Sequence, residues 1–400
     1  MRSWLPHLPF LGDNSALVKG TNPATLVASS FLILIAIGAL LLRSDWATNV
    51  PISWSDALFT ATSAVTVTGL AVLDTDTHFS TAGQMVLLVL VQLGGIGIMT
   101  FAALTLLLLG HQLGIGEQRL VREAMNHTRV MDLGWLIKRI FVLVFVIELV
   151  GFLLLSVILI PDQGWLTGSY HALFYSISAF NNAGFALTSE SLVPKAGHWP
   201  LALVLGSLAV IGGLGFTVLA ELRLRTRWSA MSLHSRLMLS GTAILLLFTF
   251  VVFLLCEWSN PATLGSYDTS EKLAIGFFHA IVPRSAGFNM VDIGSLTLAV
   301  TMLYIVLMFI GAGTNSSGGG IKVTTFMVLI LSTRAFLSGR TSPSVFGRSI
   351  PLELVLKSLA MAFIAMMIVL VTLFALTLTD PHLGFLNLFF ERFTLRFKCL

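Results

Sequence analysis

Charged side chains are scarce in this sequence. Asp, Glu, Lys and Arg together make up 10% of the 400 residues, whereas an ordinary soluble domain carries about a quarter. Hydrophobic residues make up 56%. This composition excludes an ordinary soluble domain and predicts an integral membrane protein.

Cysteine is also scarce, because the sequence contains only Cys256 and Cys399. Two distant cysteines exclude a disulfide framework and do not indicate a transition-metal site. The net charge is only +4 and the basic residues lie in short loops, so nucleic-acid binding is not expected. Residues 1–20 are broken by Pro and Gly and do not form a cleavable signal peptide. No nucleophile, base and acid fall in one plausible pocket, so we expect no enzyme activity and no catalytic residues.

Long apolar runs dominate what is present. A helix that spans a bilayer needs about 20 mostly apolar residues. Seven stretches meet this length, at residues 25–42, 85–110, 140–160, 201–220, 237–256, 296–330 and 352–378, of which the sixth is interrupted.

Shorter, semi-polar segments follow the first, third and fifth spans. They read LFTATSAVTVTGLAVLDT, LFYSISAFNNAGFALTSE and FFHAIVPRSAGFNMVDIG. Each breaks at a glycine followed by Leu or Phe, and these glycines, Gly69, Gly184 and Gly287, are 115 and 103 residues apart. The spacing predicts a repeated unit of helix, half-helix with loop, and helix.

Lys and Arg concentrate in residues 111–139, 221–236 and 331–351. The positive-inside rule predicts that these loops and the N-terminus are cytoplasmic. Acids such as Asp74, Asp76, Asp162 and Glu190 lie near the half-helices. We therefore expect the half-helices to enter from the outer face, at an acidic mouth that concentrates cations.

Non-helical backbone cannot face lipid, so each loop after a half-helix must line something inside the protein. A central glycine allows close approach of carbonyl groups, and rings of carbonyls can replace the hydration shell of a monovalent cation. The inward-pointing C-terminus of each half-helix adds partial negative charge. These loops predict three segments of a selectivity filter, formed by Val67, Thr68, Gly69, Asn182, Ala183, Gly184, Ser285, Ala286 and Gly287.

The loops VTVTGL, FNNAGF and PRSAGFN, together with GAGTNSSGGGIK in the sixth span, resemble the Trk/Ktr/HKT superfamily of K+ transporters. The resemblance covers the chain from about residue 24, and the short leader is similar to the Ktr branch. It implies four joined units of outer helix, pore helix and inner helix around one pore. In this family a glycine in every filter loop accompanies K+ selectivity, and Gly69, Gly184 and Gly287 match that pattern.

The resemblance also implies a gate where the sixth span is broken. Gate residues would be Gly311, Gly313, Thr314, Asn315, Ser316, Ser317, Gly318, Gly319, Gly320 and Lys322. Two alternatives stay open. The glycines could serve close helix packing, or the segment could cradle phosphate, although the P-loop spacing is missing.

We therefore expect an all-α integral membrane protein of pseudo-fourfold arrangement, with three complete units and a fourth incomplete one. The units are residues 24–110, 140–222, 237–330 and 352–391, with filter loops near 66–70, 181–185 and 284–288. A leader at 1–23 and cytoplasmic loops at 111–139, 223–236 and 331–351 complete the chain.

The fourth unit departs from the pattern. The repeat predicts a fourth filter glycine near residues 390–402, but residues 392–400 read RFTLRFKCL and contain no glycine. This tail is typical of a frameshift or an artificial end. One alternative is therefore a non-conducting fragment that lacks a quarter of the filter.

Several polar and charged residues lie within the spans or beside the predicted filter loops. Glu148 lies in the middle of a span, where an acid is a functional candidate, although a hydrogen bond inside the bundle is the simpler role. The resemblance implies that Arg284 supports the third filter loop from behind, held by acids or carbonyls. Asn181 is expected to hold the second loop in shape. His171 and His279 lack partners at ligand spacing and are expected to serve packing or capping.

The resemblance implies K+ uptake across the plasma membrane (the cell inner membrane), driven by the membrane potential with or without assistance from Na+. A Na+-permeable relative is the alternative within transport. No cofactor is expected. The resemblance further implies a homodimer on a cytoplasmic, nucleotide-binding regulatory ring.

Overall fold

The computed structural model describes residues 23–112, 133–224, 227–284, 286–314, 316–340 and 343–379. These residues are mainly helical, which confirms the predicted helical membrane fold. One small addition is a hairpin of two strands, β1 (Ser344–Val345) and β2 (Arg348–Ser349), which pair antiparallel.

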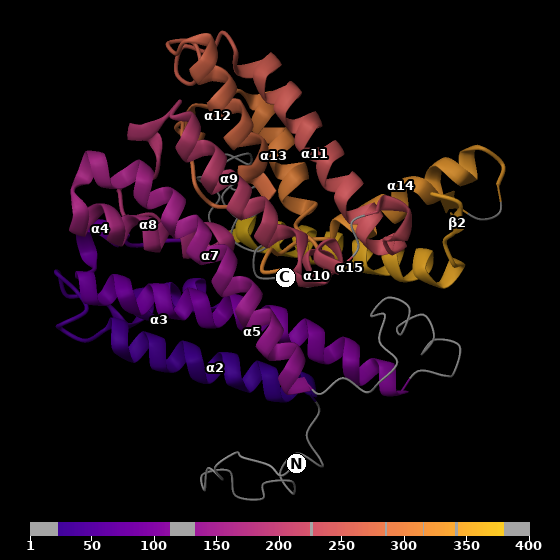
Figure 1. Cartoon of the computed structure of the whole chain (residues 1–400), viewed down its shortest axis with the longest axis horizontal. Helices are drawn as coiled ribbons and strands as arrows, with labels where there is room; N and C mark the ends of the chain where they lie inside the picture. The colour runs from indigo at the N-terminus through magenta and orange to yellow at the C-terminus, as the bar shows by residue number, and fades with distance from the viewer. Residues whose placement is uncertain are drawn as a thin grey trace, which may run out of the picture.

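The first unit contains α2 (Pro23–Leu42), α3 (Trp54–Val65), the short α4 (Thr75–His78) and α5 (Thr81–Gln112). The indigo and violet helices α2, α3 and α5 lie against one another in Figure 1. Ser53 begins α3 as an N-cap, because its hydroxyl accepts a hydrogen bond from Asp56 N. The predicted order of outer helix, half-helix and inner helix is present here.

The second unit contains α7 (Leu133–Gln163), α8 (Trp165–Phe180), a 3-10 turn η1 (Val193–Lys195), α9 (Trp199–Leu214) and α10 (Phe216–Leu224). The sequence predicted one continuous span at residues 201–220, whereas the structure divides these residues between two helices. The chain bends by 99° between α9 and α10. Gly215 lies at the bend with a φ of 85°, a conformation that glycine adopts at no steric cost.

The third unit contains α11 (Leu233–Glu257), α12 (Thr269–Ile281), the 3-10 turns η3 (Val282–Arg284) and η4 (Ile293–Ser295), α13 (Leu298–Phe309) and α14 (Val323–Leu337). The predicted interruption of the sixth span is confirmed, because residues 310–322 separate α13 from α14. Two loops that the sequence predicted, at residues 223–236 and 331–351, are shorter than expected. After the 3-10 turn η2 (Trp228–Ala230), α11 already begins at Leu233, and α14 extends to Leu337.

The fourth unit is represented by α15 (Leu352–Thr379), which packs against α14. The rest of this predicted unit and the tail at 392–400 lie outside the described residues, as do the leader at 1–22 and most of the first basic loop.

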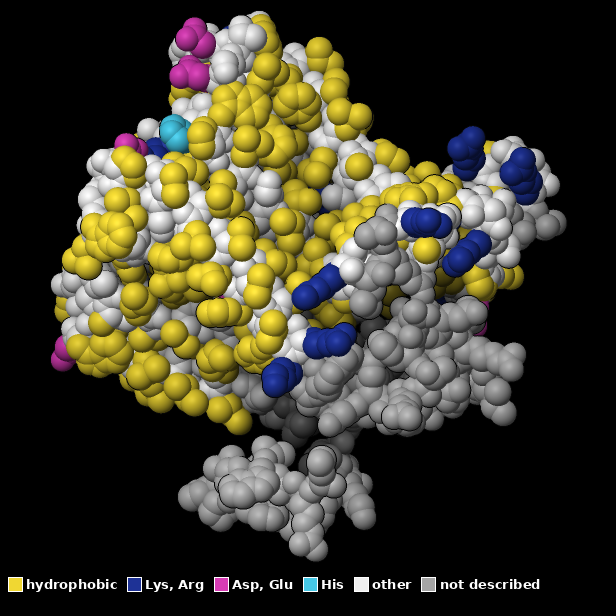
Figure 2. Space-filling model, viewed as in Figure 1, with side chains coloured by type: hydrophobic (Ala, Val, Ile, Leu, Met, Phe, Trp, Pro, Cys, Tyr) yellow, Lys and Arg dark blue, Asp and Glu magenta, His cyan; other side chains and the backbone are white. Residues whose placement is uncertain are grey.

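Within the described residues, α7, α11 and α15 are each long and apolar enough to cross a bilayer, and the bent pair α9 and α10 adds a fourth span if it is counted as one. Figure 2 shows hydrophobic side chains covering most of the visible face. Most of the Lys and Arg side chains in this view gather beside α10, α14 and the hairpin, and most of the Asp and Glu side chains lie at the other end. Which of the two ends faces the cytoplasm stays a prediction.

Inner-helix glycines allow the half-helices to lie close. A Cβ atom added to Gly94 of α5 would lie 2.0 Å from the carbonyl oxygen of Val65, the last residue of α3. A Cβ added to Gly212 of α9 would lie 1.8 Å from the carbonyl oxygen of Phe180, the last residue of α8. The same close approach therefore occurs in two units.

We predict that Gly94→Ala lowers stability by about 1–3 kcal/mol, the usual cost of overpacking, because the backbone of α3 must move to admit a methyl group. Gly97→Ala on the same helix is the matched control, since its Cβ would meet Phe31 at an ordinary 3.4 Å. Thermal unfolding of both variants in detergent checks this. Equal melting temperatures for the two variants would contradict the prediction.

Candidate functional site

The half-helices α3 and α8 end in the same backbone arrangement. In each unit the next three residues turn back onto the helix through three main-chain hydrogen bonds. After α3 the bonds run from Thr66 N to Thr62 O (2.9 Å), Val67 N to Ala64 O (3.1 Å) and Thr68 N to Ser63 O (2.8 Å). After α8 the matching bonds run from Asn181 N to Ile177 O (3.0 Å), Asn182 N to Ala179 O (3.1 Å) and Ala183 N to Ser178 O (2.8 Å). Segments 115 residues apart thus share one local structure.

Left-handed backbone recurs at matching positions of these loops. Val67 and Asn182 have φ values of 54° and 55°, and Gly69 and Gly184 have 72° and 73°. Gly287 in the third loop has a φ of 79°. A β-branched residue such as Val67 is an outlier in this region, and such strain costs on the order of 1–3 kcal/mol and clusters at functional sites.

Two serines that the sequence analysis missed hold the residue after each glycine. Ser63 Oγ accepts a hydrogen bond from Leu70 N at 2.8 Å. Ser178, at the matching position, donates to the carbonyl oxygen of Phe185 at 2.9 Å. Their spacing of 115 residues was the available signal.

The second and third predicted filter loops are in contact. A Cβ atom added to Gly184 would lie 2.6 Å from the Cα of Gly287. Beyond the glycines, Leu192 N donates to Asn289 O at 3.0 Å, and Asn289 N donates to Ser191 Oγ at 3.2 Å. The second loop also contacts the inner helix of the first unit, because Asn181 Nδ2 donates to Gln92 Oε1 of α5 at 2.9 Å.

A buried histidine forms a hydrogen bond with the backbone of the segment that follows the third glycine. His279 of α12 accepts a hydrogen bond from Met290 N at its Nε2 (3.1 Å), and its Nδ1 lies 3.0 Å from the hydroxyl of Tyr304. The hydroxyl of Tyr304 in turn donates to the carbonyl oxygen of His279 at 3.1 Å. These contacts give His279 the structural role that was expected. His171 packs beside Tyr170 and Tyr175.

Arg284 is buried in the turn η3 directly before the third loop. The sequence predicted acids or carbonyls around its guanidinium group. In the described part of the chain its buried Nε has no hydrogen-bond partner, and the supporting role of the guanidinium group stays a prediction. The following residue, Ser285, lies outside the described residues, whereas Ala286 is described and donates to Val282 O at 3.2 Å.

Asn181, the C-cap residue of α8, joins a polar network behind the second loop. Its Nδ2 donates to Glu148 Oε1 at 3.1 Å, and Gln92 Nε2 donates to Glu148 Oε2 at 2.8 Å. Glu148 is 6% exposed. The expected hydrogen bond of Glu148 inside the bundle is confirmed. Gln92 is a further member of this network that the sequence did not predict. The neighbouring Asn182 donates to Phe180 O at 3.4 Å.

The predicted gate segment forms a folded loop between α13 and α14. Its two ends pair, because Gly311 N donates to Ile321 O and Ile321 N donates to Phe309 O, both at 3.0 Å. Lys322 Nζ donates to Gly318 O at 2.8 Å, and Ser316 Oγ donates to Gly313 O at 2.7 Å. Ser317 is buried, and the hydroxyl of Thr314 lies 3.3 Å from that of Thr324. Gly319 O accepts a hydrogen bond from Ala312 N, and Gly320 has a φ of 80°. Asn315 lies outside the described residues.

This loop contacts the end of α9. Gly313 N donates to Gly213 O at 2.7 Å. A Cβ atom added to Gly213 would lie 3.7 Å from the Cβ of Ala312 and 3.9 Å from Asn182 Nδ2. Gly213 therefore lies between the predicted gate loop and the second predicted filter loop.

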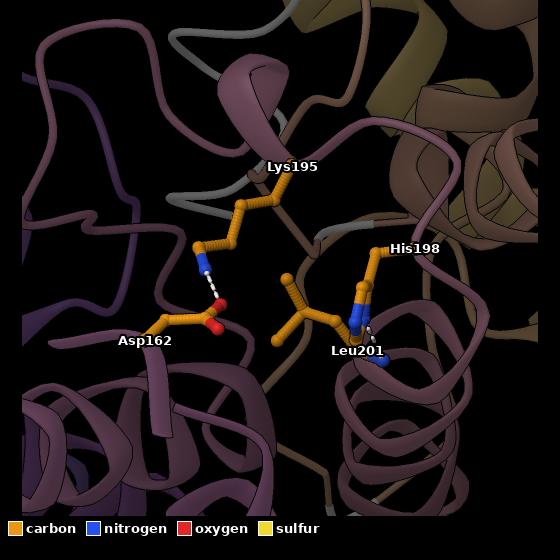
Figure 3. Close-up of polar contacts among 4 residues, drawn as sticks. All are labelled: Asp162, Lys195, His198 and Leu201. Carbon is orange, nitrogen blue, oxygen red and sulfur yellow. Dashed lines mark hydrogen bonds and ion pairs between the residues drawn. The ribbon is translucent and has the colours of Figure 1, made fainter. Parts of the chain in front are cut away.

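The segment between the second filter loop and α9 is fixed to the end of α7. Lys195 Nζ lies 2.7 Å from Asp162 Oδ2 (Figure 3). His198 caps α9 by accepting a hydrogen bond from Leu201 N at its Nδ1, at 3.3 Å. Asp162, one of the acids assigned to the mouth, is thus paired.

Comparison with known proteins gives consistent matches. The family model for TrkH, described as a cation transport protein, matches residues 8–394. Ktr system potassium uptake protein B of Bacillus subtilis is 43% identical over 93% of this chain and 84% of that protein. Potassium/sodium uptake protein NtpJ of Enterococcus hirae is 35% identical over 90% of this chain and 80% of that protein. The crystal structure of the potassium transporter TrkH from Vibrio parahaemolyticus superposes with a TM-score of 0.69 at 20% identity, over 95% of this chain and 75% of that one.

We predict that Gly184→Ala disrupts the contact between the second and third loops, because its methyl group would overlap the backbone of Gly287. Gly164→Ala is the matched control, since Gly164 has a similar φ of 80° but its added Cβ would meet no described atom within 4 Å beyond its chain neighbours. Left-handed strain is then common to both variants, and only Gly184→Ala adds crowding. We expect added K+ to raise the melting temperature of the unsubstituted chain and of Gly164→Ala but not of Gly184→Ala, and an equal response of the two variants would contradict this.

Proposed function

Because the chain belongs to the TrkH family of cation transport proteins, we propose that it takes up potassium ions across the membrane through a filter of main-chain carbonyl groups. One observation carries the proposal. Left-handed glycines follow half-helix ends in all three loops, and Gly184 and Gly287 are in contact.

The filter residues would be the three triplets predicted from the sequence. Their carbonyl oxygens would replace water around a dehydrated K+ ion, as in other carbonyl-lined filters. The C-terminal ends of α3, α8 and α12 lie directly before these loops and would add partial negative charge where the cation binds. No enzymatic step is involved, and K+ is the transported ion and not a cofactor.

The loop between α13 and α14 would act as the gate. Its ends are paired and its serines are buried, while the hydrogen bond from Lys322 holds Gly318 O. Opening then requires exchange of a small number of hydrogen bonds and no change in the long helices. The free energy of such an exchange is of the order that binding of a regulatory partner can supply.

Sodium transport is the second candidate, because the relative from Enterococcus hirae is named as a potassium/sodium uptake protein. In this chain all three described loops carry glycine, which favours K+. Na+ would then assist uptake or permeate weakly.

For partners, we propose a regulatory subunit, in keeping with relatives that are named as parts of a Ktr system. Arg223, Arg227, Arg340 and Arg348 lie in the basic loops, and a cytoplasmic nucleotide-binding ring would dock there. Two copies of the chain would form a homodimer in the plasma membrane, with the N-terminus in the cytoplasm. A homodimer would also cover part of the exposed apolar surface of α15.

Growth of K+-uptake-deficient bacteria at low external K+ tests the function. Expression of this chain should restore growth and the uptake of K+. Replacement of K+ by Na+ in the flux assay should reduce the measured flux about tenfold or more, because a tenfold ratio corresponds to a difference in binding free energy of about 1.4 kcal/mol. Equal K+ and Na+ fluxes would favour the sodium candidate. No flux of either ion, with normal insertion in the membrane, would contradict uptake by this chain.

We predict that Lys322→Met raises basal K+ uptake about threefold to tenfold, because it removes a charge-assisted hydrogen bond worth about 1.5–3 kcal/mol and a positive charge beside the ion path. Lys357→Met is the control, since Lys357 is exposed on α15 and pairs with Glu353 one turn away. Flux per inserted molecule is the measurement. Unchanged or lower uptake in Lys322→Met than in the control would argue against a gate at this loop.

A further inference from the structure

We propose that the carboxyl group of Glu148 is the positioning group of the second filter loop. It holds the side chain of Asn181, and through Asn181 it fixes the left-handed turn at Asn182 that sets the direction of the following carbonyls. The inference rests on the proposed function and adds to it a residue outside the loops that tunes cation binding.

Glu148 is placed to do this by three helices. It lies in α7, and it accepts hydrogen bonds from Gln92 of α5 and from Asn181 at the end of α8. Ser176 Oγ of α8 also donates to the carbonyl oxygen of Glu148 at 2.7 Å. In the described residues no Lys, Arg or His pairs with Glu148, so its charge or proton is supported by amide groups alone.

Asn181 transmits this constraint to the backbone. Its own N–H bonds Ile177 O, and the two hydrogens of its Nδ2 are shared among three acceptors, Ile177 O at 3.0 Å, Glu148 Oε1 and Gln92 Oε1. The main-chain N–H and the side-chain NH2 group are therefore both held, whereas the buried Oδ1 has no partner among the described residues. The next residue, Asn182, has a φ of 55°, and an unfavourable conformation of this kind persists only where the surroundings determine it.

Comparison of the units shows that this anchor belongs to the second loop. Thr66 occupies the matching position in the first unit, and its hydroxyl bonds Thr62 O at 2.7 Å, within its own half-helix. It also lies 2.6 Å from Thr68 Oγ1, inside the same loop. The first loop thus reaches the same backbone with local bonds, whereas the second uses a carboxyl group from another helix.

Donor and acceptor geometry explains why a carboxyl group is needed. Gln92 and Asn181 both present NH2 groups to Glu148. A glutamine at position 148 would offer one oxygen and one NH2 group, so a donor would face a donor. Turning the amide of Gln92 moves this conflict to Asn181, and turning Asn181 breaks its bond to Ile177 O. Buried donors left without acceptors are costly, so we expect the loop to shift.

The experiment is a double-mutant cycle between positions 148 and 181. The variants are Glu148→Gln, Asn181→Thr and the two combined, because a threonine at 181 can form the local bond that Thr66 forms and needs no carboxyl group. Ser156→Ala is the control, since Ser156 is a buried serine of α7 whose hydroxyl has no hydrogen-bond partner among the described residues. The measurements are the K+ concentration for half-maximal thermal stabilisation, the half-saturating K+ concentration for uptake, and the K+ to Na+ flux ratio.

We expect Glu148→Gln to raise the half-maximal K+ concentration about tenfold and to lower the flux ratio, which corresponds to the loss of one buried hydrogen bond. In the Asn181→Thr background the same substitution should change both values less than twofold. Ser156→Ala should behave as the unsubstituted chain. If Glu148→Gln alone does not fold, the combined variant should restore folding and K+ binding.

An equal effect of Glu148→Gln in both backgrounds would overturn the inference, because Glu148 would then act by a route that does not pass through Asn181. Failure of both Glu148→Gln variants to fold would overturn it for the same reason. A normal K+ response of Glu148→Gln would overturn the inference alone. Absence of any K+ response in the unsubstituted chain would instead overturn the proposed function.

Discussion

Main-chain groups that leave a helix inside a bilayer must find partners within the protein, because lipid supplies none. The fold depends on how this requirement is met where α3, α8 and α12 end. After α3 and α8 the chain turns back onto the last turn of the helix. In all three units a side chain from the half-helix bonds the loop further on, as Ser63, Ser178 and His279 do. The half-helix ends are further held by close approach to inner-helix glycines such as Gly94 and Gly212.

The units repeat their backbone more closely than their side chains. Val67 and Asn182 share a conformation that neither prefers, although one is an apolar branched residue and the other a polar amide. Thr66, Asn181 and Arg284 occupy one position and differ completely in their contacts: a local bond, a network across three helices, and a guanidinium group whose Nε has no described partner. A cation at the centre would therefore meet similar carbonyl geometry supported by dissimilar surroundings. Substitutions behind different loops should not be equivalent.

The features that the sequence predicted are those that local patterns encode. Apolar length gave the spans, and the recurrence of Gly69, Gly184 and Gly287 located the loops. The bend at Gly215 was not predicted, because glycine in an apolar run serves helix packing as often as it ends a helix. The network of Gln92, Glu148 and Asn181 joins residues 33 to 89 positions apart, and no local pattern contains such pairing. The predicted roles of Ser285 and Asn315 and the fourth filter quarter fall outside the described residues.

The bend between α9 and α10 leaves a free main-chain acceptor beside the proposed gate loop. In a continuous helix the carbonyl oxygen of Gly213 would accept the N–H four residues later. Because α9 ends at Leu214, this carbonyl is one of the last four of the helix and is left free. Gly313 N of the proposed gate loop donates to it at 2.7 Å, while a Cβ atom added to Gly213 would lie 3.9 Å from Asn182 Nδ2 of the second predicted filter loop. The break at Gly215 therefore leaves a main-chain acceptor that the proposed gate loop uses. The proposed gate loop and the second predicted filter loop thus both lie beside Gly213 of α9.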